Sequence, residues 1–295
     1  MPVTSSALGP CLAATITTDR VDACVEAWCT YLHHTIAWEQ ALSPGQAEQW
    51  GRPALAGCRT VWLKNAAGEP WLRFIQDNTA VPVEPFRHTG WLSLEVNVQN
   101  VEALHRDLLD SPFTIIGPPA TLDISADISA MQVVGPAGEV LYLTEIKKAV
   151  PGFDLPLARS TVDRLFIPVL LVSDRDAALA TYEQFPNTGG NCFETRITVL
   201  NRAHELAPET RHRIATIQLS GRNLIEVDEF PGLTPPQIAN CGLPTGISMI
   251  SFAVAGGYLA GDLVDAYTSL EEPFSGSRAR LLTGSGGELI EIIER

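Results

Sequence analysis

The stretch GGELIEIIE, residues 286–294, decides the fold, because three earlier stretches of the chain repeat its design. The earlier stretches are AAGEPWLRFIQ (66–76), PAGEVLYLTEI (136–146) and SGRNLIEVDEF (220–230). In each one, a turn that contains glycine leads into a short strand rich in apolar residues. They follow one another at intervals of roughly 65 to 85 residues, which indicates one supersecondary unit used four times.

Each unit opens with a predicted strand followed by a predicted helix. The strand and helix pairs are 11–18 with 20–32, 91–98 with 99–109, 165–173 with 175–185, and 247–255 with 261–270. In the first helix, Val21, Val25 and Trp28 recur at the spacing that lines one helical face. Asp19 and Asp174 precede the first and third helices, where an aspartate side chain can cap free backbone amides.

With the strands that follow each helix, every unit is predicted to be βαβββ, so the fold class is α+β. A four-stranded sheet with a helix on one face leaves its other face open. Two units must therefore pair into a curved mixed sheet that forms a cup with its helices outside. Residues 147–161 suit a linker, and the Pro- and Gly-rich segments 78–90 and 231–246 suit connectors within domains. We predict one domain over 1–150, from units one and two, and a second over 151–295, from units three and four.

The composition narrows the range of partners. The chain has 295 residues and a net charge of -14, so nucleic acid and anionic membranes repel it and neither is an expected partner. No apolar run approaches the roughly 20 residues of a membrane helix, and the N-terminus lacks the basic region of a signal peptide. The six cysteines show no CxxC spacing, which is typical of free thiols in a reducing compartment. We expect a cytoplasmic protein, either a monomer or a homodimer.

The four βαβββ units, with final strands of the form Gly-x-x-x-Glu, resemble the vicinal oxygen chelate superfamily over nearly the whole chain. That superfamily includes glyoxalase I, bleomycin- and fosfomycin-resistance proteins and extradiol dioxygenases. The resemblance implies that each cup holds a small organic molecule. It does not imply one reaction, because this fold carries many chemistries.

Metal-dependent members of the superfamily place a histidine near the start of a unit's first strand and a glutamate in its last strand. The positions equivalent to the histidine fall near Leu12, Trp91, Ile167 and Met249. The positions equivalent to the glutamate are Arg73 (or, in the alternative register, Leu72), Tyr142, Glu226 and Glu291. Two carboxylates without a histidine make a poor iron, zinc or nickel site. We therefore expect no cofactor and no metal ligands, although Mg²⁺ or Ca²⁺ stays open if further oxygen ligands contribute.

Strand alternation predicts which side chains enter the cup of the second domain. Glu226, Glu291 and His212 are the candidate catalytic residues there, with Gln218 and Met249 as candidate substrate-binding residues. Two nearby carboxylates raise each other's pKa, so one of them is expected to carry a proton near neutral pH. The alternative is that both acids are solvated or paired with Arg278 or Arg280.

The cup of the first domain offers Arg73, Trp91 and Tyr142 as candidate substrate-binding residues, with Glu95 facing the same way. An arginine among aromatic rings could hold the carboxylate of a flat molecule. The alternative is an ion pair between Arg73 and Glu95 that merely fills the cup, or an Arg73 that extends to solvent.

Three functions fit these features. The first is a metal-independent enzyme with acid–base lyase or isomerase chemistry next to a carbonyl group. The second is a non-catalytic protein that binds a small molecule, like the drug-sequestering relatives. The third is the metal-dependent dioxygenase or glyoxalase-type enzyme that the superfamily resemblance implies.

Overall fold

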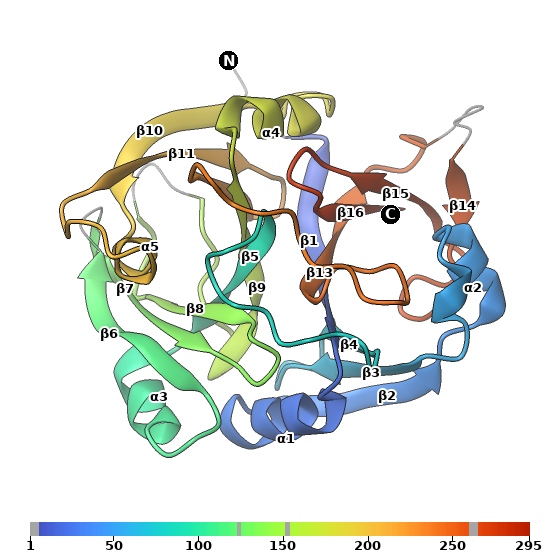
Figure 1. Cartoon of the computed structure of the whole chain (residues 1–295), viewed down its shortest axis with the longest axis horizontal. Helices are drawn as coiled ribbons and strands as arrows, with labels where there is room; N and C mark the ends of the chain where they lie inside the picture. The colour runs from blue at the N-terminus through green and yellow to red at the C-terminus, as the bar shows by residue number, and fades with distance from the viewer. Residues whose placement is uncertain (1–5, 123–124, 151–153, 260–264) are drawn as a thin grey trace.

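The computed structural model describes residues 6–122, 125–150, 154–259 and 265–295. Its strands form two eight-stranded curved sheets that lie back to back, each with its concave face turned outward (Figure 1). The helices are few and short, so the fold is α+β, as predicted.

The described elements confirm four units with one strand plan, and the helix after the first strand is described in units one, two and three. Unit one contains β1 (Leu8–Thr18), α1 (Val21–Tyr31), β2 (Thr35–Ala41), α2 (Pro44–Gln49), the 3-10 turn η1 (Pro53–Leu55), β3 (Arg59–Lys64) and β4 (Pro70–Gln76). Unit two contains β5 (Gly90–Val98), α3 (Val101–Leu108), β6 (Thr114–Leu122), β7 (Ser125–Val134) and β8 (Val140–Ile146). Unit three contains β9 (Val162–Val172), α4 (Arg175–Tyr182), β10 (Gly190–Arg196), α5 (Thr198–Ala203), β11 (Arg211–Gln218) and β12 (Leu224–Glu229). Unit four contains β13 (Gly246–Val254), β14 (Ala266–Thr268), β15 (Arg278–Thr283) and β16 (Leu289–Glu294).

The predicted helix starts are confirmed in one unit and wrong in another. Asp174 caps α4, because its carboxylate accepts hydrogen bonds from the amides of Asp176 and Ala177. In unit one, the residue at the N-cap is Arg20, and no side chain caps α1. The helix predicted over 261–270 falls partly on 260–264, outside the described residues, and residues 266–268 form strand β14 instead.

The pairing of the units differs from the prediction. One sheet has the order β14-β15-β16-β13-β1-β4-β3-β2 and so joins units one and four. The other has the order β10-β11-β12-β9-β5-β8-β7-β6 and joins units two and three. We refer to these as the terminal-unit sheet and the middle-unit sheet, and to their concave faces as the terminal cup and the middle cup.

The connectors explain why the sequence misled us about pairing. The segments 78–90 and 231–246, expected within domains, carry the chain from one sheet to the other. Residues 147–161, expected between domains, join β8 to β9 within the middle-unit sheet. Each of the three connectors is long enough to lead either to the other sheet or back to its own sheet. Their composition therefore does not determine which units pair. The choice is made by the antiparallel pairing of β1 with β13 and of β5 with β9.

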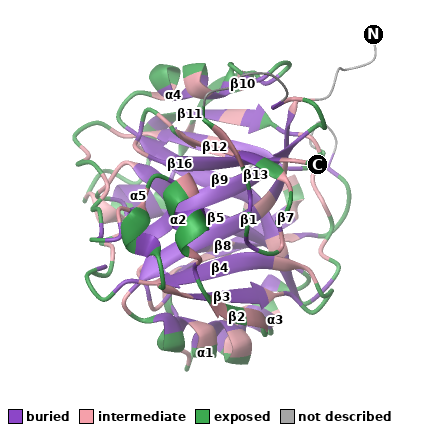
Figure 2. Ribbon diagram, turned by 90° about the vertical axis from the view of Figure 1, so that its right-hand side faces the viewer, coloured by how far each residue is buried: buried purple, intermediate pink, exposed green. Residues whose placement is uncertain are grey.

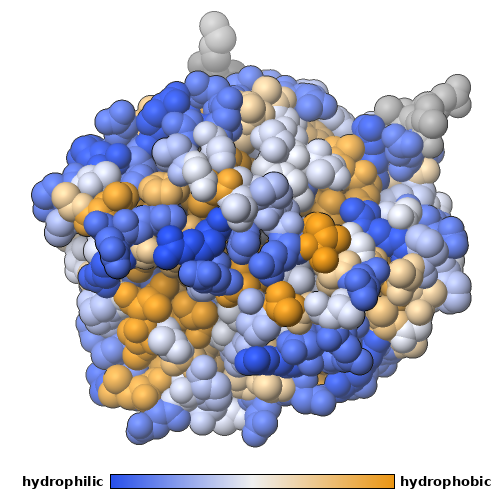
Figure 3. Space-filling view, viewed as in Figure 1, coloured by the Kyte–Doolittle hydropathy of each residue, from blue (hydrophilic) through white to orange (hydrophobic). Residues whose placement is uncertain are grey.

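The largest hydrophobic core lies between the two sheets and includes apolar residues of α1, α3 and α4. The central strands are almost fully buried, whereas the outer faces of the helices are exposed (Figure 2). On the face shown in Figure 3, hydrophobic side chains gather over β6 and β8 of the middle-unit sheet. Within the described ranges, no helix is long and apolar enough to cross a membrane.

The repeated turns also hold the two sheets together, because each sends one side chain to the opposite sheet. The Glu139 carboxylate accepts a hydrogen bond from the Trp28 indole at 3.2 Å. Asn223 accepts one from the backbone amide of Cys11 at 3.0 Å. These contacts join the middle-unit turns to unit one.

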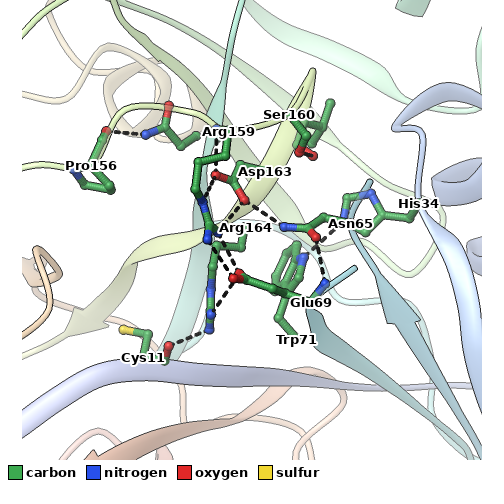
Figure 4. A network of polar contacts seen from close by, with 12 residues as sticks. Cys11, His34, Asn65, Glu69, Trp71, Pro156, Arg159, Ser160, Asp163 and Arg164 are labelled. Carbon is green, nitrogen blue, oxygen red and sulfur yellow. Dashed lines mark hydrogen bonds and ion pairs between the residues drawn. The ribbon is translucent and has the colours of Figure 1, made fainter. Parts of the chain in front are cut away.

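The repeated turns of units one and four contact unit three and the segment that precedes it. Glu288 accepts a hydrogen bond from the Tyr182 hydroxyl at 3.3 Å. Glu69 receives two 2.6 Å bonds from the guanidinium of Arg159, which extends from the segment before β9 (Figure 4). Arg159 also bonds to the buried Asp163, so this contact is part of a network.

Candidate active site

The two cups have equivalent frameworks, which allows their residues to be compared position by position. Within each cup, the same parallel and antiparallel registers relate the two central strands and the strands beside them. When unit one is superposed on unit two and unit four on unit three, the equivalent residues, terminal cup first, are Thr15 and Glu95, Arg73 and Tyr142, Met249 and Ile167, and Glu291 and Glu226.

The terminal cup is filled by its own side chains. The segment from α2 to Trp50 enters it, and Trp50 packs in a cluster with Met249 and Leu289. The Trp50 indole donates to the Tyr267 hydroxyl at 2.9 Å and to the Glu291 carboxylate at 3.2 Å. These contacts close the cup from its open side.

Arg73 lies at the centre of this filled cup. Its side chain is 2% exposed, and its Nη2 atom lies 3.7 Å from a Glu291 oxygen. Its guanidinium also lies over the rings of Trp50, at 4.7 Å, and Trp62, at 5.0 Å. Burial lowers the pKa of Arg73, and the Glu291 charge opposes this shift. The ion pair that we considered for Arg73 therefore exists, but its partner is Glu291 and not Glu95.

The middle cup contains an open cavity of about 490 Å³. Its walls are largely apolar, with lining residues that include Ile128, Phe166, Ile167, Ile214 and Leu224. Helix α5, between β10 and β11, borders the cavity without filling it. Arg196 and Arg202 line the exposed part, where Arg196 pairs with Glu209 and Arg202 bonds to the Ile116 carbonyl.

The polar part of the lining is a group of acids on neighbouring strands. Glu95, on β5, accepts a 2.6 Å hydrogen bond from the Thr144 hydroxyl. Burial, and then the charge of Glu226, raise the pKa of Glu95 to about 8. Glu226, on β12, also lines the cavity, and burial raises its pKa as well. Both carboxyls therefore exchange protons closer to neutral pH than ordinary glutamates do.

Two further groups extend this acidic cluster. Asp228 is fully buried, and burial, followed by the charge of Glu226, holds its pKa well above the usual range. Burial and the same acids raise the pKa of Tyr142. The Tyr142 hydroxyl has no hydrogen-bond partner among the described residues, whereas the Asp228 carboxyl interacts with Glu226 through a side-chain hydrogen bond that also raises its pKa. Buried polar groups normally have partners, so this cluster is suited to a ligand.

The structure groups the predicted site residues differently from the sequence. Glu226 and Tyr142, assigned to different domains, meet in the middle cup. Glu291, Arg73 and Met249 meet in the terminal cup, where Met249 contacts the Arg73 guanidinium at 3.6 Å. Glu226 and Glu291 therefore do not share a cup. The cause is the pairing of units one with four and two with three.

Trp91 was expected to face a cup and lies on the opposite side of its sheet. The register of β5 with β9 shifts between Trp91 and Ser93, so the alternation of faces is interrupted there. The Trp91 indole instead donates to the Leu289 carbonyl at 2.8 Å and packs near Phe252, between the sheets. A bulge of this kind leaves no clear signal in the sequence.

His212 and Gln218 are on the middle-unit sheet but do not line the large cavity. The His212 ring shares a 2.6 Å hydrogen bond with the Asn201 side chain, and burial lowers its pKa. Gln218 donates to the carbonyls of Leu219 and Asn223 at the end of its hairpin. Both side chains thus have local structural partners.

Sequence reasoning missed the importance of Glu95 and Thr144. Alternation along the strands had placed Glu95 towards a cup, but we considered it only as a partner for Arg73. Its relation to Glu226 depends on β5 and β9 being neighbours in one sheet, which the repeat pattern does not reveal.

Solved structures share this arrangement over nearly the whole chain. Glyoxalase I from Zea mays superposes with a TM-score of 0.61 at 12% identity, covering 96% of this chain and 92% of that chain. A putative dioxygenase from Bacillus subtilis gives a TM-score of 0.61 at 11% identity, covering 99% of this chain and 86% of that chain. The chain has the vicinal oxygen chelate fold. No protein-family model and no curated protein matches its sequence, so the likeness is one of fold.

The vicinal oxygen chelate fold raises the question of a metal ion. Within the described ranges, no three His, Cys, Asp or Glu side chains are grouped so that they could hold one. The four equivalent positions of the middle cup carry Glu95, Tyr142, Ile167 and Glu226. Two carboxyls with raised pKa values and no imidazole do not fit a transition metal.

Proposed function

We propose that the middle cup is the active site of an enzyme that moves protons on a small organic molecule without a transition metal. The observation that carries the proposal is Glu95, a cavity-lining carboxyl whose pKa is raised to about 8. A general acid or base works best when its pKa lies near the operating pH. An ordinary surface glutamate does not meet this condition.

Glu95 and Glu226 divide the chemistry between them. Their mutual repulsion and their burial disfavour a state in which both are ionised. The protonated carboxyl donates to a carbonyl oxygen of the substrate, and the ionised one removes a proton from the adjacent carbon. Returning the proton to another atom gives an isomerase, whereas loss of a leaving group gives a lyase.

Two other features support this assignment. The apolar walls of the cavity lower the local dielectric around the buried acids, which strengthens the interactions of the polar groups. The Tyr142 hydroxyl, which has no partner among the described residues, can donate a hydrogen bond to the oxygen on which negative charge develops.

Deuterium exchange tests this proposal without knowledge of the natural substrate. The chain is incubated in heavy water with a panel of small ketones, aldehydes and hydroxyketones, and exchange next to the carbonyl is followed by NMR. We expect exchange with at least one compound, lost in both Glu95→Gln and Glu226→Gln. Glu291→Gln makes the same change in the terminal cup and should keep the exchange. Exchange that persists in both middle-cup variants would contradict the assignment.

A second candidate is ligand capture without reaction. The Tyr142 hydroxyl, which has no hydrogen-bond partner within the described ranges, and the preformed cavity favour ligand capture equally, since neither requires chemistry. In that case a bound compound is recovered unchanged from the protein after prolonged incubation, and no exchange with solvent deuterium occurs.

A further inference from the structure

In the terminal cup, a cationic side chain compensates the charge of a buried glutamate, Glu291. Glu291 is 1% exposed and receives a hydrogen bond from Ser251 at 2.6 Å. The guanidinium of Arg73 lies 3.7 Å from it and donates to the Thr15 hydroxyl at 2.9 Å. A positively charged nitrogen group thus occupies the centre of this cup and compensates its carboxylate.

The middle cup has more acidic residues at these positions, and none of the described residues places a cationic group at its centre. Glu226 takes the place of Glu291, and Glu95 takes the place of Thr15. The residue equivalent to Arg73 is Tyr142, whose side chain carries no positive charge. The centre of the cup, where the other cup holds a guanidinium, belongs to the open cavity.

The remaining charges of the cavity lining lie farther out. Arg196 and Arg202 are exposed and have partners of their own, so they do not neutralise the buried acids. Asp228, fully buried and in side-chain hydrogen-bond contact with Glu226, adds a third acid to the cluster. Burial without a compensating charge raises the pKa of an acid, so the acid stays protonated. A cation bound beside it lowers that pKa and favours the ionised form.

We propose, on the basis of the function assigned to this cup, that its ligand carries one positively charged nitrogen group, an amine, amidine or guanidinium, which binds Glu226 and Glu95 at the position that Arg73 fills in the terminal cup. The rest of the ligand is apolar next to the walls and neutral or anionic near Arg196 and Arg202. The single positive charge stabilises one further ionised carboxyl in the acidic cluster while another keeps its proton, so binding releases a proton to the solvent.

Three small molecules of similar shape test whether the middle cup requires a positive charge on its ligand. Isothermal titration calorimetry of the full chain with benzamidine, benzamide and benzoate compares a cation, a neutral molecule and an anion. We expect benzamidine to bind at least roughly tenfold more tightly than the other two, because a hydrogen bond between charged groups is worth more than 1 kcal/mol. The heat of benzamidine binding should differ between phosphate and Tris buffers at one pH, because the released protons are taken up by the buffer.

Variants locate the binding. Tyr142→Arg places in the middle cup the guanidinium that the terminal cup already has, so it should abolish benzamidine binding. Tyr142→Phe removes the hydroxyl without adding a charge, so it should weaken benzamidine binding less than Tyr142→Arg does. Glu226→Gln should weaken benzamidine at least roughly tenfold, whereas Glu291→Gln, the equivalent change in the terminal cup, should not. Circular dichroism confirms that each variant is folded, and Glu226→Gln decides the test if Tyr142→Arg does not fold.

The outcomes separate the two proposals. If benzamide or benzoate binds as tightly as benzamidine and Glu226→Gln weakens that binding, the cup is a ligand site but the inferred charge is wrong. If benzamidine binds equally well to wild type, Tyr142→Arg and Glu226→Gln, it binds elsewhere and the inference fails. If none of the three probes binds, the inferred ligand class is wrong; the proposed function then stands if deuterium exchange depends on Glu95 and Glu226, and fails as well if no exchange is seen.

Discussion

The carboxylate of Glu139 accepts a hydrogen bond from the indole nitrogen of Trp28 at 3.2 Å, and so joins the last turn of unit two to the helix of unit one. The same carboxylate accepts a second bond from the amide of Ala137 at 2.8 Å. Glu139 belongs to one of the four repeated turns, and the corresponding residues of the other three also cross to the opposite sheet. The repeat therefore builds each sheet and also joins the two sheets.

Removing the Glu139 side chain should destabilise the protein. Glu139→Ala leaves two buried donors, on Trp28 and Ala137, without an acceptor, which costs about 2–4 kcal/mol of the free energy of unfolding. Glu139→Gln retains an acceptor and should cost less. Urea unfolding monitored by tryptophan fluorescence measures the difference, with Glu102→Ala on the exposed face of α3 as the control. Equal stability of Glu139→Ala and this control would contradict the role given to the contact.

Glu139 and Glu288 should also make stability depend on pH. Burial raises the pKa of each to about 7. The folded state therefore holds protons that the unfolded state has already released, and stability falls as pH rises from about 4.5 to about 7.

The effect is measured by comparing variants at pH 5 and pH 7.5. Buried His34, whose pKa is lowered to about 4, acts in the opposite direction between about 6.5 and 4, so wild type alone is not sufficient. The double variant Glu139→Gln with Glu288→Gln lacks only the carboxyl contribution. Wild type should lose more stability than this variant over the interval, and a smaller loss would be inconsistent with the raised pKa values.

The stability of the protein should depend strongly on both members of the buried Arg73–Glu291 ion pair in the terminal cup. Arg73→Met leaves the Glu291 carboxylate buried without its cation, and should lower stability by about 3–5 kcal/mol. Combining Arg73→Met with Glu291→Leu removes both charges, and should recover most of the loss, since apolar pairs often replace buried ion pairs at little cost. Thermal and urea unfolding check both variants. A double variant less stable than Arg73→Met would argue against an uncompensated charge as the cause.

In the network before β9, substitution of Asp163 should lower stability more than substitution of Arg159 does. Asp163 is 4% exposed and accepts a 2.7 Å bond from the Asn65 amide, so Asp163→Ala leaves that amide unpaired at a cost of about 1–3 kcal/mol. The Arg159 side chain is 50% exposed, and Arg159→Ala should cost about 1 kcal/mol or less. Parallel urea titrations of the two variants rank them, and the reverse order would contradict this reading of the network.

Much of the local structure could be predicted from residues that are close in the chain. The Gly-containing turns, the apolar strands after them and the cap at Asp174 depend on neighbours within a few residues. The faces of β11 and β12 were likewise predicted, and Thr216 and Glu226 line the cavity as alternation required. Trp91 shows the limit of this reasoning, because one extra residue in β5 reverses the face and follows from strand pairing.

The sequence by itself determined the βαβββ units, their number and the absence of histidine from the equivalent positions of the cups. Only the tertiary structure decided that unit one pairs with unit four, that Arg73 meets Glu291, and that Glu95 and Glu226 share a cavity. The physical reason is range. Turns, caps and alternation are local preferences of the backbone, whereas the choice among four similar strand edges depends on how whole sheets pack around one core, and each of the connectors between units is long enough to allow either pairing.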